Sequence, residues 1–278
     1  MTISIQGKKG SYSDIAAKHL FGNNIEVLER DTFKEVFEDL KHGNAQYIVI
    51  PVENSTYGSV YQNYDLITQY NFRIIKEIYL KVNFHLIGFP DRNLKDITEV
   101  YTHPVAMGQI QDFLSKNPQI KAVEYPDTAG SVTYIKEKNL KSSAAAASRK
   151  AAEVNGMKII QENIQSNKQN YTRFFALEKN TGKFKYEENA NKTSLEFKLG
   201  EESGSLFKCI KPFAERNISL IKIESRPIIN THWQFTFYLD VKAGIQDKRM
   251  LEALKELEKA TKNYRIIGSY KKGEYIET

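Results

Sequence analysis

Short apolar runs alternate with helix-like patterns over the first 180 residues, and this alternation restricts the possible folds more than any other feature of the sequence. Strands are expected at 3–5, 25–28 and 47–50, and residues 73–89 are expected to be rich in β-structure. Such alternation is typical of α/β folds, in which helices cover a sheet. Because 47–50 is apolar throughout, we expect its sheet to be covered on both faces.

Capping residues indicate where the intervening helices begin and end. Ser13 is expected to cap a helix that stops at Gly22. Thr32, with a glutamate three residues later, forms a capping box for a helix that stops at Gly43. The alanine run 144–147 is expected to pack closely as part of a helix. Three further helices and a returning strand are predicted, at 103–115, 127–138, 142–155 and 171–177.

A polar, turn-rich stretch at 179–191 is typical of a linker. The elements predicted after it follow the order βαββαβ, the ferredoxin-like arrangement, at 193–199, 204–216, 218–225, 232–241, 246–260 and 264–270. We therefore expect an α/β domain at 1–180, a linker at 181–192 and a second domain at 193–278. This topology serves many functions and assigns none.

Composition excludes several classes of protein. The net charge is +6, and basic runs such as Lys8-Lys9 are no longer than pairs, so we expect no nucleic-acid partner. No stretch approaches the ~18 apolar residues of a membrane span, and we expect no signal peptide and no membrane. A single cysteine, Cys209, fits a reducing, cytoplasmic location and excludes cysteine-based metal sites. Neither the spacing of the five histidines nor Gly7-x-x-Gly10 supports a metal or a cofactor.

The segment 51–58 is a candidate site, because it directly follows the buried strand 47–50. In open α/β sheets, ligands bind beyond the carboxyl ends of strands. Glu53, Asn54 and Ser55 would supply a carboxylate, an amide and a hydroxyl there. A polar turn that caps the next helix explains the same residues equally well.

A second candidate is the segment 101–109. Pro104 suits the first turn of a helix, which puts Thr102 and His103 at a helix N-terminus where backbone amides attract anions. Gln109 lies two turns further on and can point the same way. Alternatively, His103 only caps the helix or is half-buried, and Gln109 faces solvent.

The third candidate is the strand 171–175. Arg173 stands between aromatic residues, and its planar guanidinium could hold a carboxylate through two hydrogen bonds. Strand alternation puts Thr172 and Phe174 on one face and Arg173 on the other. Arg173 therefore reaches the same cleft only if the strand ends or bends there, and an edge strand with a solvated arginine is the alternative.

In this order, the segments resemble the prephenate dehydratase family along the whole chain. The most specific motifs are Glu53-Asn54-Ser55 and Thr172-Arg173-Phe174, and Asp127-Thr128-Ala129 also matches. The resemblance implies a two-lobed, periplasmic-binding-protein-like (type II) catalytic domain. Its first lobe would comprise about 1–78 and 160–180, and its second lobe about 79–159.

The resemblance also implies a carbon–oxygen lyase that converts prephenate to phenylpyruvate, water and carbon dioxide without a cofactor. It implies catalytic roles for Thr172, Glu53 and Arg173. Thr172 or a protonated Glu53 would assist departure of the hydroxyl, and Arg173 would pair with a carboxylate. Residues expected to bind the substrate are Asn54, Ser55, Thr102, Gln109, Thr128 and Phe174.

The last 85 or so residues are similar to an ACT regulatory domain, with Glu224-Ser225-Arg226-Pro227 as its distinctive motif. The resemblance implies feedback inhibition by phenylalanine and a homodimer or homotetramer. Residues expected at the phenylalanine site are Gly204, Ser205, Leu206, Asn217, Leu220, Glu224, Ser225 and Arg226. Two alternatives stay open: a dehydratase acting on arogenate, and a non-catalytic amino-acid sensor.

Overall fold

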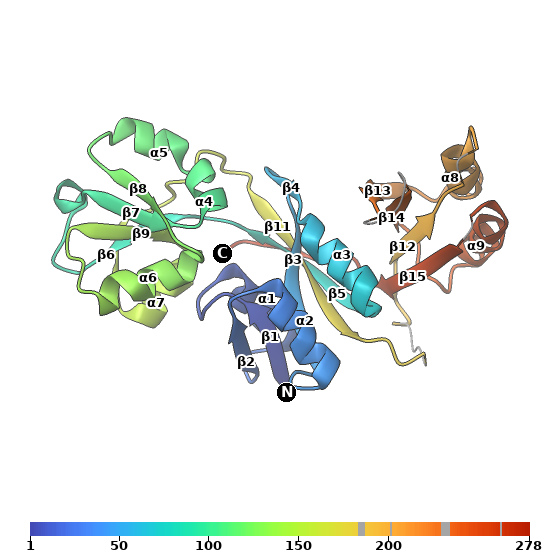
Figure 1. Ribbon diagram of the computed structural model, residues 1–278, viewed down its shortest axis with the longest axis horizontal. Helices are drawn as coiled ribbons and strands as arrows, with labels where there is room; N and C mark the ends of the chain where they lie inside the picture. Colours follow the sequence, from blue (N-terminus) through green and yellow to red (C-terminus); the bar gives the residue numbers. More distant parts are fainter. Residues whose placement is uncertain (183–186, 201, 229–233, 262) are drawn as a thin grey trace. The chain divides into compact units, whose positions relative to one another are not determined.

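The computed structural model describes residues 1–182, 187–200, 202–228, 234–261 and 263–278 (Figure 1). The chain divides into two compact units. Unit 1 comprises Met1–Tyr70, Ile78–Ala176 and Glu274–Thr278, and unit 2 comprises Asn71–Glu77 and Leu177–Gly273. The expected linker, 181–192, is described only at 181–182 and 187–192; residues 183–186 lie outside the description.

The first sheet lies mostly in unit 1, and its strands β5 and β11 continue into unit 2. It has the strand order β16-β5-β11-β3-β1-β2, and β4 pairs with β3. β1 is parallel to both β2 and β3, as expected for strands joined through helices. Its strands are β1 (Thr2–Gln6), β2 (Glu26–Arg30), β3 (Tyr47–Asn54), β4 (Gly58–Ser59), β5 (Phe72–Lys81), β11 (Tyr171–Lys179) and β16 (Tyr275–Ile276). Its helices are α1 (Tyr12–Phe21), α2 (Phe33–His42) and α3 (Tyr61–Tyr70).

Local signals explain how these helices begin and end. The predicted capping box at Thr32 is confirmed, and Gly43 ends α2 in the left-handed conformation at φ 81°. The cap of α1 is Ser11, whose hydroxyl accepts the Asp14 N–H, and the prediction of Ser13 was wrong. Ser13 lies inside the helix because the turn at Gly10 lets the helix start two residues earlier.

The second sheet of unit 1 has the order β10-β6-β9-β7-β8. Its strands are β6 (His85–Gly88), β7 (Glu99–Thr102), β8 (Lys121–Glu124), β9 (Ser143–Ala147) and β10 (Lys158–Gln161). Its helices are η1 (Leu94–Asp96), α4 (Pro104–Gln109), α5 (Gln111–Lys116), α6 (Thr128–Glu137) and α7 (Arg149–Asn155). The helix expected at 103–115 is thus two short helices. β10 still belongs to this sheet, so the chain returns to the first sheet later than the expected residue 160.

The alanine run is a strand, and the prediction of a helix over 142–155 was wrong for its first half. Ala144 and Ala146 face one apolar core, whereas Ala145 and Ala147 face another. All four side chains are fully buried because helices cover both faces of this central strand. Small residues fit where a sheet is packed tightly on both sides, and this tertiary demand overrides the helix preference of alanine.

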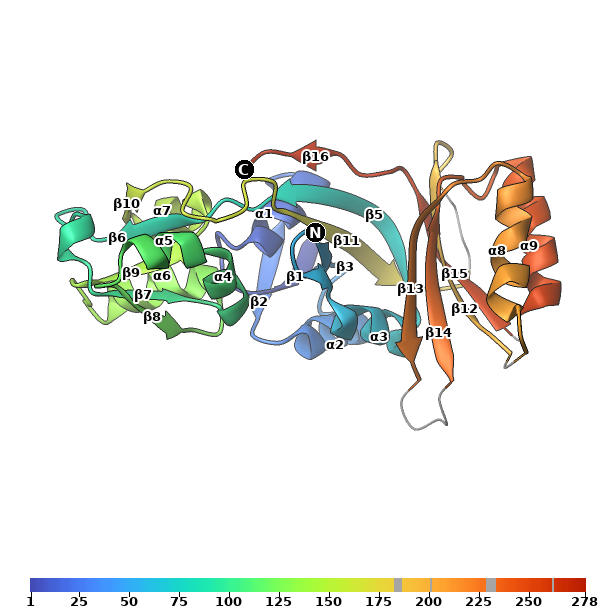
Figure 2. The ribbon, with the colours of Figure 1, turned by 90° about the horizontal axis from the view of Figure 1, so that it is seen from above.

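Unit 2 contains a four-stranded antiparallel sheet in the order β13-β14-β12-β15, with α8 and α9 packed together beside it (Figure 2). The predicted βαββαβ order is confirmed. The elements are β12 (Lys192–Lys198), α8 (Ser205–Glu215), β13 (Leu220–Pro227), β14 (Phe235–Val241), α9 (Lys248–Ala260) and β15 (Asn263–Tyr270). Residues 232 and 233, expected at the start of a strand, lie outside the described residues.

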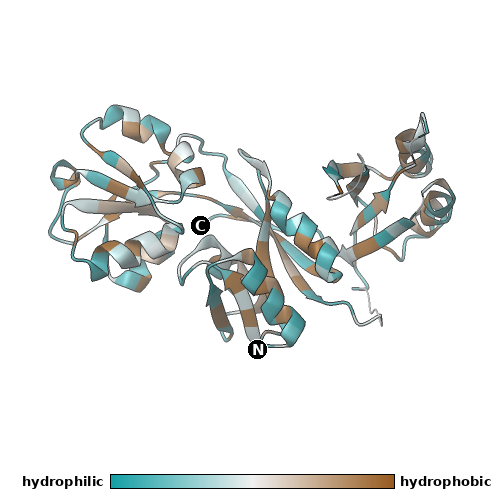
Figure 3. Cartoon of the chain, viewed as in Figure 1, coloured by the Kyte–Doolittle hydropathy of each residue, from teal (hydrophilic) through white to brown (hydrophobic). Residues whose placement is uncertain are grey.

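Hydrophobic residues concentrate on the central strands and recur along the helices (Figure 3). In unit 2 they form one core that includes Phe197, Phe213, Leu239 and the buried Cys209. Among the described helices, we find none with the length and hydrophobicity required to cross a membrane. The two-lobed α/β fold expected of the first part of the chain and the ferredoxin-like order of the second are both present.

Candidate active site

A cavity of about 510 Å³ lies within unit 1, and both of its sheets contribute to the lining. Its size is within the range of small-molecule sites. Five of the nine residues predicted to act on or bind the substrate line it. They are Asn54, Gln109, Thr128, Thr172 and Phe174.

Thr172 is held by Asn54, which ends β3. The Asn54 side-chain oxygen accepts the backbone N–H groups of Thr56 (2.9 Å) and Tyr57 (3.0 Å). Its Nδ2 must therefore face the other way, where it donates to Thr172 Oγ1 at 3.0 Å. Since Thr172 Oγ1 accepts this bond, its own proton can be offered to a group in the cavity.

The same polar chain continues to the second sheet. Asn54 Nδ2 also donates to Asn170 Oδ1 (2.7 Å), and Asn170 Nδ2 donates to Gln109 Oε1 (2.8 Å). Asn170 is 1% exposed, and Gln109 ends α4. The chain of amides therefore fixes the position of Gln109, on one lobe, relative to Thr172, on the other.

Burial shifts the pKa of three titratable groups of the lining, and it raises that of Tyr12. Burial lowers the pKa of His103, whose Nδ1 accepts the Val105 N–H at 3.2 Å, so a neutral ring presents Nε2–H as a donor. Burial raises the pKa of Asp127, although backbone N–H groups of Gly130, Ala129 and Lys8 partly oppose that shift.

Three ten-residue helices begin at the cavity. Its lining includes the first residues of α1 (Ser11–Ser13), α2 (Asp31–Phe33) and α6 (Asp127–Thr128). Helix N-termini carry partial positive charge and free N–H groups, which favour anions. No lysine or arginine appears in the lining formed by the described residues. Much of the remaining wall is apolar, from Phe33, Pro51, Val60, Val82, Phe84, Val105, Ala106 and Phe174.

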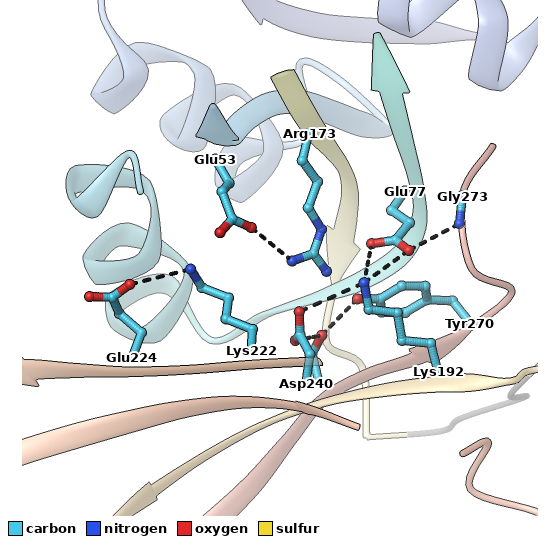
Figure 4. Close-up of polar contacts among 10 residues, drawn as sticks. Glu53, Glu77, Arg173, Lys192, Lys222, Glu224, Asp240, Tyr270 and Gly273 are labelled. Carbon is cyan, nitrogen blue, oxygen red and sulfur yellow. Dashed lines mark hydrogen bonds and ion pairs between the residues drawn. The ribbon is translucent and has the colours of Figure 1, made fainter. Parts of the chain in front are cut away.

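Glu53 and Arg173, two of the three residues predicted to be catalytic, do not line the cavity. They form an ion pair at 3.4 Å (Figure 4), and the Arg173 guanidinium lies over the Phe175 ring at 4.5 Å. Arg173 is 3% exposed. Because Thr172, Arg173 and Phe174 all lie within β11, alternation turns Arg173 to the opposite face of the sheet. The condition for a carboxylate clamp, a strand that ends or bends here, is not met.

Ser55 and Thr102 also lie outside the lining. Ser55 Oγ accepts the Tyr171 N–H at 2.9 Å and joins the end of β3 to β11. Thr102 is fully buried, and its hydroxyl donates to the Ala146 carbonyl at 2.8 Å. Both hydroxyls therefore bind backbone groups near the site.

Sequence reasoning did not assign a role to Asn170 or Asp127, which the structure brings to the site. The motif Asn170-x-Thr172 contained a usable signal, because residues two apart on a strand share a face. Asp127 precedes Thr128 as an N-cap and could have been recognised as such.

The residues expected to bind phenylalanine lie in two regions of unit 2. Gly204, Ser205 and Leu206 begin α8, and Gly204 has φ 79°. Asn217, at φ 54°, precedes β13, which carries Leu220, Glu224, Ser225 and Arg226 at one edge of the sheet. Glu224 is paired with Lys222 at 3.3 Å (Figure 4). Within the described part of the chain, no group of three or more acidic, histidine or cysteine side chains is arranged to hold a metal ion.

Comparison with known proteins places the chain in a family. Residues 3–182 match the family described as "Prephenate dehydratase". The chain is 36% identical to arogenate dehydratase 5 of Arabidopsis thaliana, over 97% of this chain and 67% of that protein. It is 32% identical to the bifunctional chorismate mutase/prephenate dehydratase of Buchnera aphidicola, over 96% of this chain and 70% of that protein.

Two solved structures match nearly the whole chain. A prephenate dehydratase from Arthrobacter aurescens, in complex with L-Phe, has a TM-score of 0.88 at 26% identity and covers 98% of this chain and 90% of its own. GqqA, described as a novel type of quorum quenching acylase, has a TM-score of 0.89 at 27% identity and covers 98% of both chains. One fold can thus serve different chemistry. The family match covers residues 3–182, and the chain aligns with more than two thirds of the length of these two relatives. This chain therefore belongs to the prephenate dehydratase family and is a carbon–oxygen lyase.

Proposed function

We propose that this protein converts prephenate to phenylpyruvate, water and carbon dioxide. The observation that carries the proposal is the Thr172 hydroxyl, which Asn54 orients toward a largely apolar cavity bordered by three helix N-termini. Prephenate is a dianion with an apolar ring. Helix N-termini suit its carboxylates, and the phenyl rings of Phe33, Phe84 and Phe174 suit its ring.

In this reaction the bond between the ring and its carboxylate breaks, and its electron pair enters the ring. The ring hydroxyl leaves with the electron pair of its C–O bond, takes up one proton that solvent supplies, and becomes water. Thr172 donates the hydrogen bond that stabilises the departing oxygen. Gln109, Thr128 and the helix N-termini hold the substrate in place, and the apolar wall removes water from the carboxylate that leaves.

The test is an assay of purified protein with prephenate, following phenylpyruvate by its absorbance in alkali. Thr172→Ala should lower kcat by about 10²–10⁴-fold, because the reaction loses its donor. Thr172→Ser keeps the hydroxyl and should stay within about tenfold of the unmodified protein. Near-normal turnover by a folded Thr172→Ala variant would remove Thr172 from the mechanism.

Arogenate is the competing substrate, since the Arabidopsis relative bears the name arogenate dehydratase. Arogenate carries an ammonium group where prephenate has a keto group. The cavity contains two carboxyl groups that could attract this ammonium group, but Asp31 is already paired with Lys8 at 3.1 Å, and burial raises the pKa of Asp127 and so disfavours its charged form. We propose prephenate as the preferred substrate, and kcat/KM measured for both compounds tests this choice.

We further propose that unit 2 is an ACT domain that binds phenylalanine between two copies of the chain. β13 lies at a sheet edge and exposes Ile221 (43%) and Ile223 (45%), which a second copy would cover. The related Arthrobacter enzyme was crystallised with L-Phe. A phenylalanine titration of activity tests the regulation, and light scattering of the protein tests the pairing of two copies. Activity that stays flat across the titration would defeat the first part, and a monomeric mass would defeat the second.

A further inference from the structure

A five-residue segment of unit 1, Glu274–Thr278, follows unit 2 in the sequence, where the second domain was expected and no helix or strand was predicted. We call it the tail segment. Its strand β16 lies beside β5 (Figure 2) and pairs with it in parallel. Tyr275 stands opposite Tyr79, and Ile276 opposite Leu80. The Tyr79 N–H also donates to the Glu274 carbonyl at 3.0 Å. The tail segment therefore completes the edge of the first sheet.

Two side chains of the tail segment bind the residue that precedes Thr172. The Tyr275 ring stacks on Tyr79, with ring centres 4.6 Å apart, and packs edge-on against Tyr171 at 5.3 Å. The Glu277 carboxylate accepts a hydrogen bond from the Tyr171 hydroxyl (2.9 Å) and pairs with the Lys81 ammonium group (2.7 Å). These contacts hold β11 where Thr172 enters the cavity.

The last residue of the segment binds one of the two connections between the lobes. Residues 82–84 link β5 of the first sheet to β6 of the second. Thr278 Oγ1 donates to the Lys81 carbonyl (2.7 Å), and Asn83 Nδ2 donates to the Thr278 carbonyl (2.9 Å). The Asn83 carbonyl in turn accepts the hydroxyl of Tyr12 (2.6 Å), which lines the cavity.

The start of the tail segment is anchored as well. In unit 2, the Gly273 N–H donates to Glu77 Oε1 at 3.0 Å (Figure 4). A Cβ at residue 273 would lie 2.4 Å from the Glu77 carbonyl oxygen, so only glycine fits. Gly273, which directly precedes the tail segment, is therefore held against Glu77 of β5. From there β5 and the tail segment both continue to residues 81–83, where the connection between the lobes begins.

We propose that Tyr275 and Glu277 are positioning residues for the dehydratase reaction. They fix Tyr171, and through it Thr172, and they steady the lobe connection at 81–83. The inference rests on the proposed function, because its kinetic readout is dehydratase turnover. A tail segment that only covered the edge of β5 would affect stability and leave turnover unchanged at temperatures where the protein is folded.

The experiment compares Tyr275→Ala and Glu277→Ala in the full chain. We expect each to lower kcat about tenfold with KM changed less than threefold, since small displacements of a catalytic group are costly. Glu277→Gln keeps an acceptor for the Tyr171 hydroxyl and should recover most of the loss. The matched control is Glu153→Ala, which removes another exposed ion pair of unit 1, with Lys150 at 2.8 Å, away from the cavity.

A double-mutant cycle isolates the contact. If Glu277 acts through the Tyr171 hydroxyl, Glu277→Ala combined with Tyr171→Phe should cost no more than the larger single change. Hydrogen exchange of amides 81–84 and 170–172 should quicken in Glu277→Ala and not in the control. Unchanged kcat in both alanine variants, or faster exchange with unchanged kcat, overturns the proposal. Failure of the proposed function would appear separately, as an unmodified protein that produces no phenylpyruvate.

Discussion

Asn54 decides which way the Thr172 proton points. Two backbone N–H groups occupy its oxygen, so its amide nitrogen is the group that faces Thr172. A threonine hydroxyl can donate only one hydrogen bond. With an amide donor beside it, that single proton is kept for the substrate.

Asn54→Asp should therefore impair catalysis without removing a side chain. One carboxylate oxygen would still accept the two backbone N–H groups, but the other would draw the Thr172 proton toward itself and face Asn170 Oδ1. We expect kcat to fall about 10²-fold with a smaller change in KM, as for loss of one transition-state hydrogen bond. Steady-state kinetics measure this, and a KM effect alone would contradict the account.

His103 gives unit 1 a pH-sensitive contribution to stability. Burial lowers its pKa below the ordinary value of 6.5, so in acid the unfolded chain takes up a proton before the folded protein does. Stability is therefore lost as the pH falls below 6.5 toward the lowered pKa. His103→Asn keeps a cap for the Val105 N–H and does not titrate. We expect its melting temperature to fall less than that of the unmodified protein between pH 7 and 5.5; equal falls would contradict the assignment.

At the scale of elements, β9 shows how tightly the second lobe is packed. Ala145, a residue of β9, is fully buried against the helix layer that includes α6 and α7. Ala145→Leu adds three heavy atoms where no space is present and should destabilise the protein by about 1–3 kcal/mol. Urea unfolding measures this, with Val154→Leu on the exposed face of α7 as the control. An unchanged midpoint for Ala145→Leu would mean that the layer can expand.

Sequence reasoning succeeded for elements that have a cap or a clear period. The Thr32 capping box and the βαββαβ order were predictable because each rests on local chemistry. The run at 144–147 is too short to show a period, so only the surrounding helices determine that it is a strand. β16 has two residues and owes its structure to β5. No local pattern could have predicted it.

The candidate site was predictable in part for the same reason. Alternation along β11 correctly grouped Thr172 with Phe174 and separated Arg173. Arg173 was nevertheless assigned to a substrate carboxylate, on the condition that the strand ends or bends there. Whether a strand bends at a given residue depends on its neighbours in the sheet, here Glu53 on β3 and Tyr79 on β5. Those neighbours are more than 90 residues away in the sequence.

At the scale of the whole molecule, unit 2 depends on a fully buried lysine. Lys192 binds Glu77 at 2.8 Å and lies 3.7 Å from Asp240 (Figure 4). Lys192→Met would leave two buried carboxylates without their cation and should cost about 3–5 kcal/mol of stability. Adding Glu77→Gln removes one of these charges and should recover part of the loss. Thermal unfolding of the intact chain tests both, and a Lys192→Met variant as stable as the unmodified protein would contradict the prediction.

The tail segment also has a consequence for the order of synthesis. Unit 1 takes its first strand from residues 2–6 and its edge strand from residues 275–276, with all of unit 2 translated in between. On the ribosome, β5 therefore has an open edge until unit 2 has been translated and residues 275–276 have emerged. An open edge can pair with other chains. A nascent chain stalled before residue 274 should thus aggregate more readily than one in which β16 is already in place.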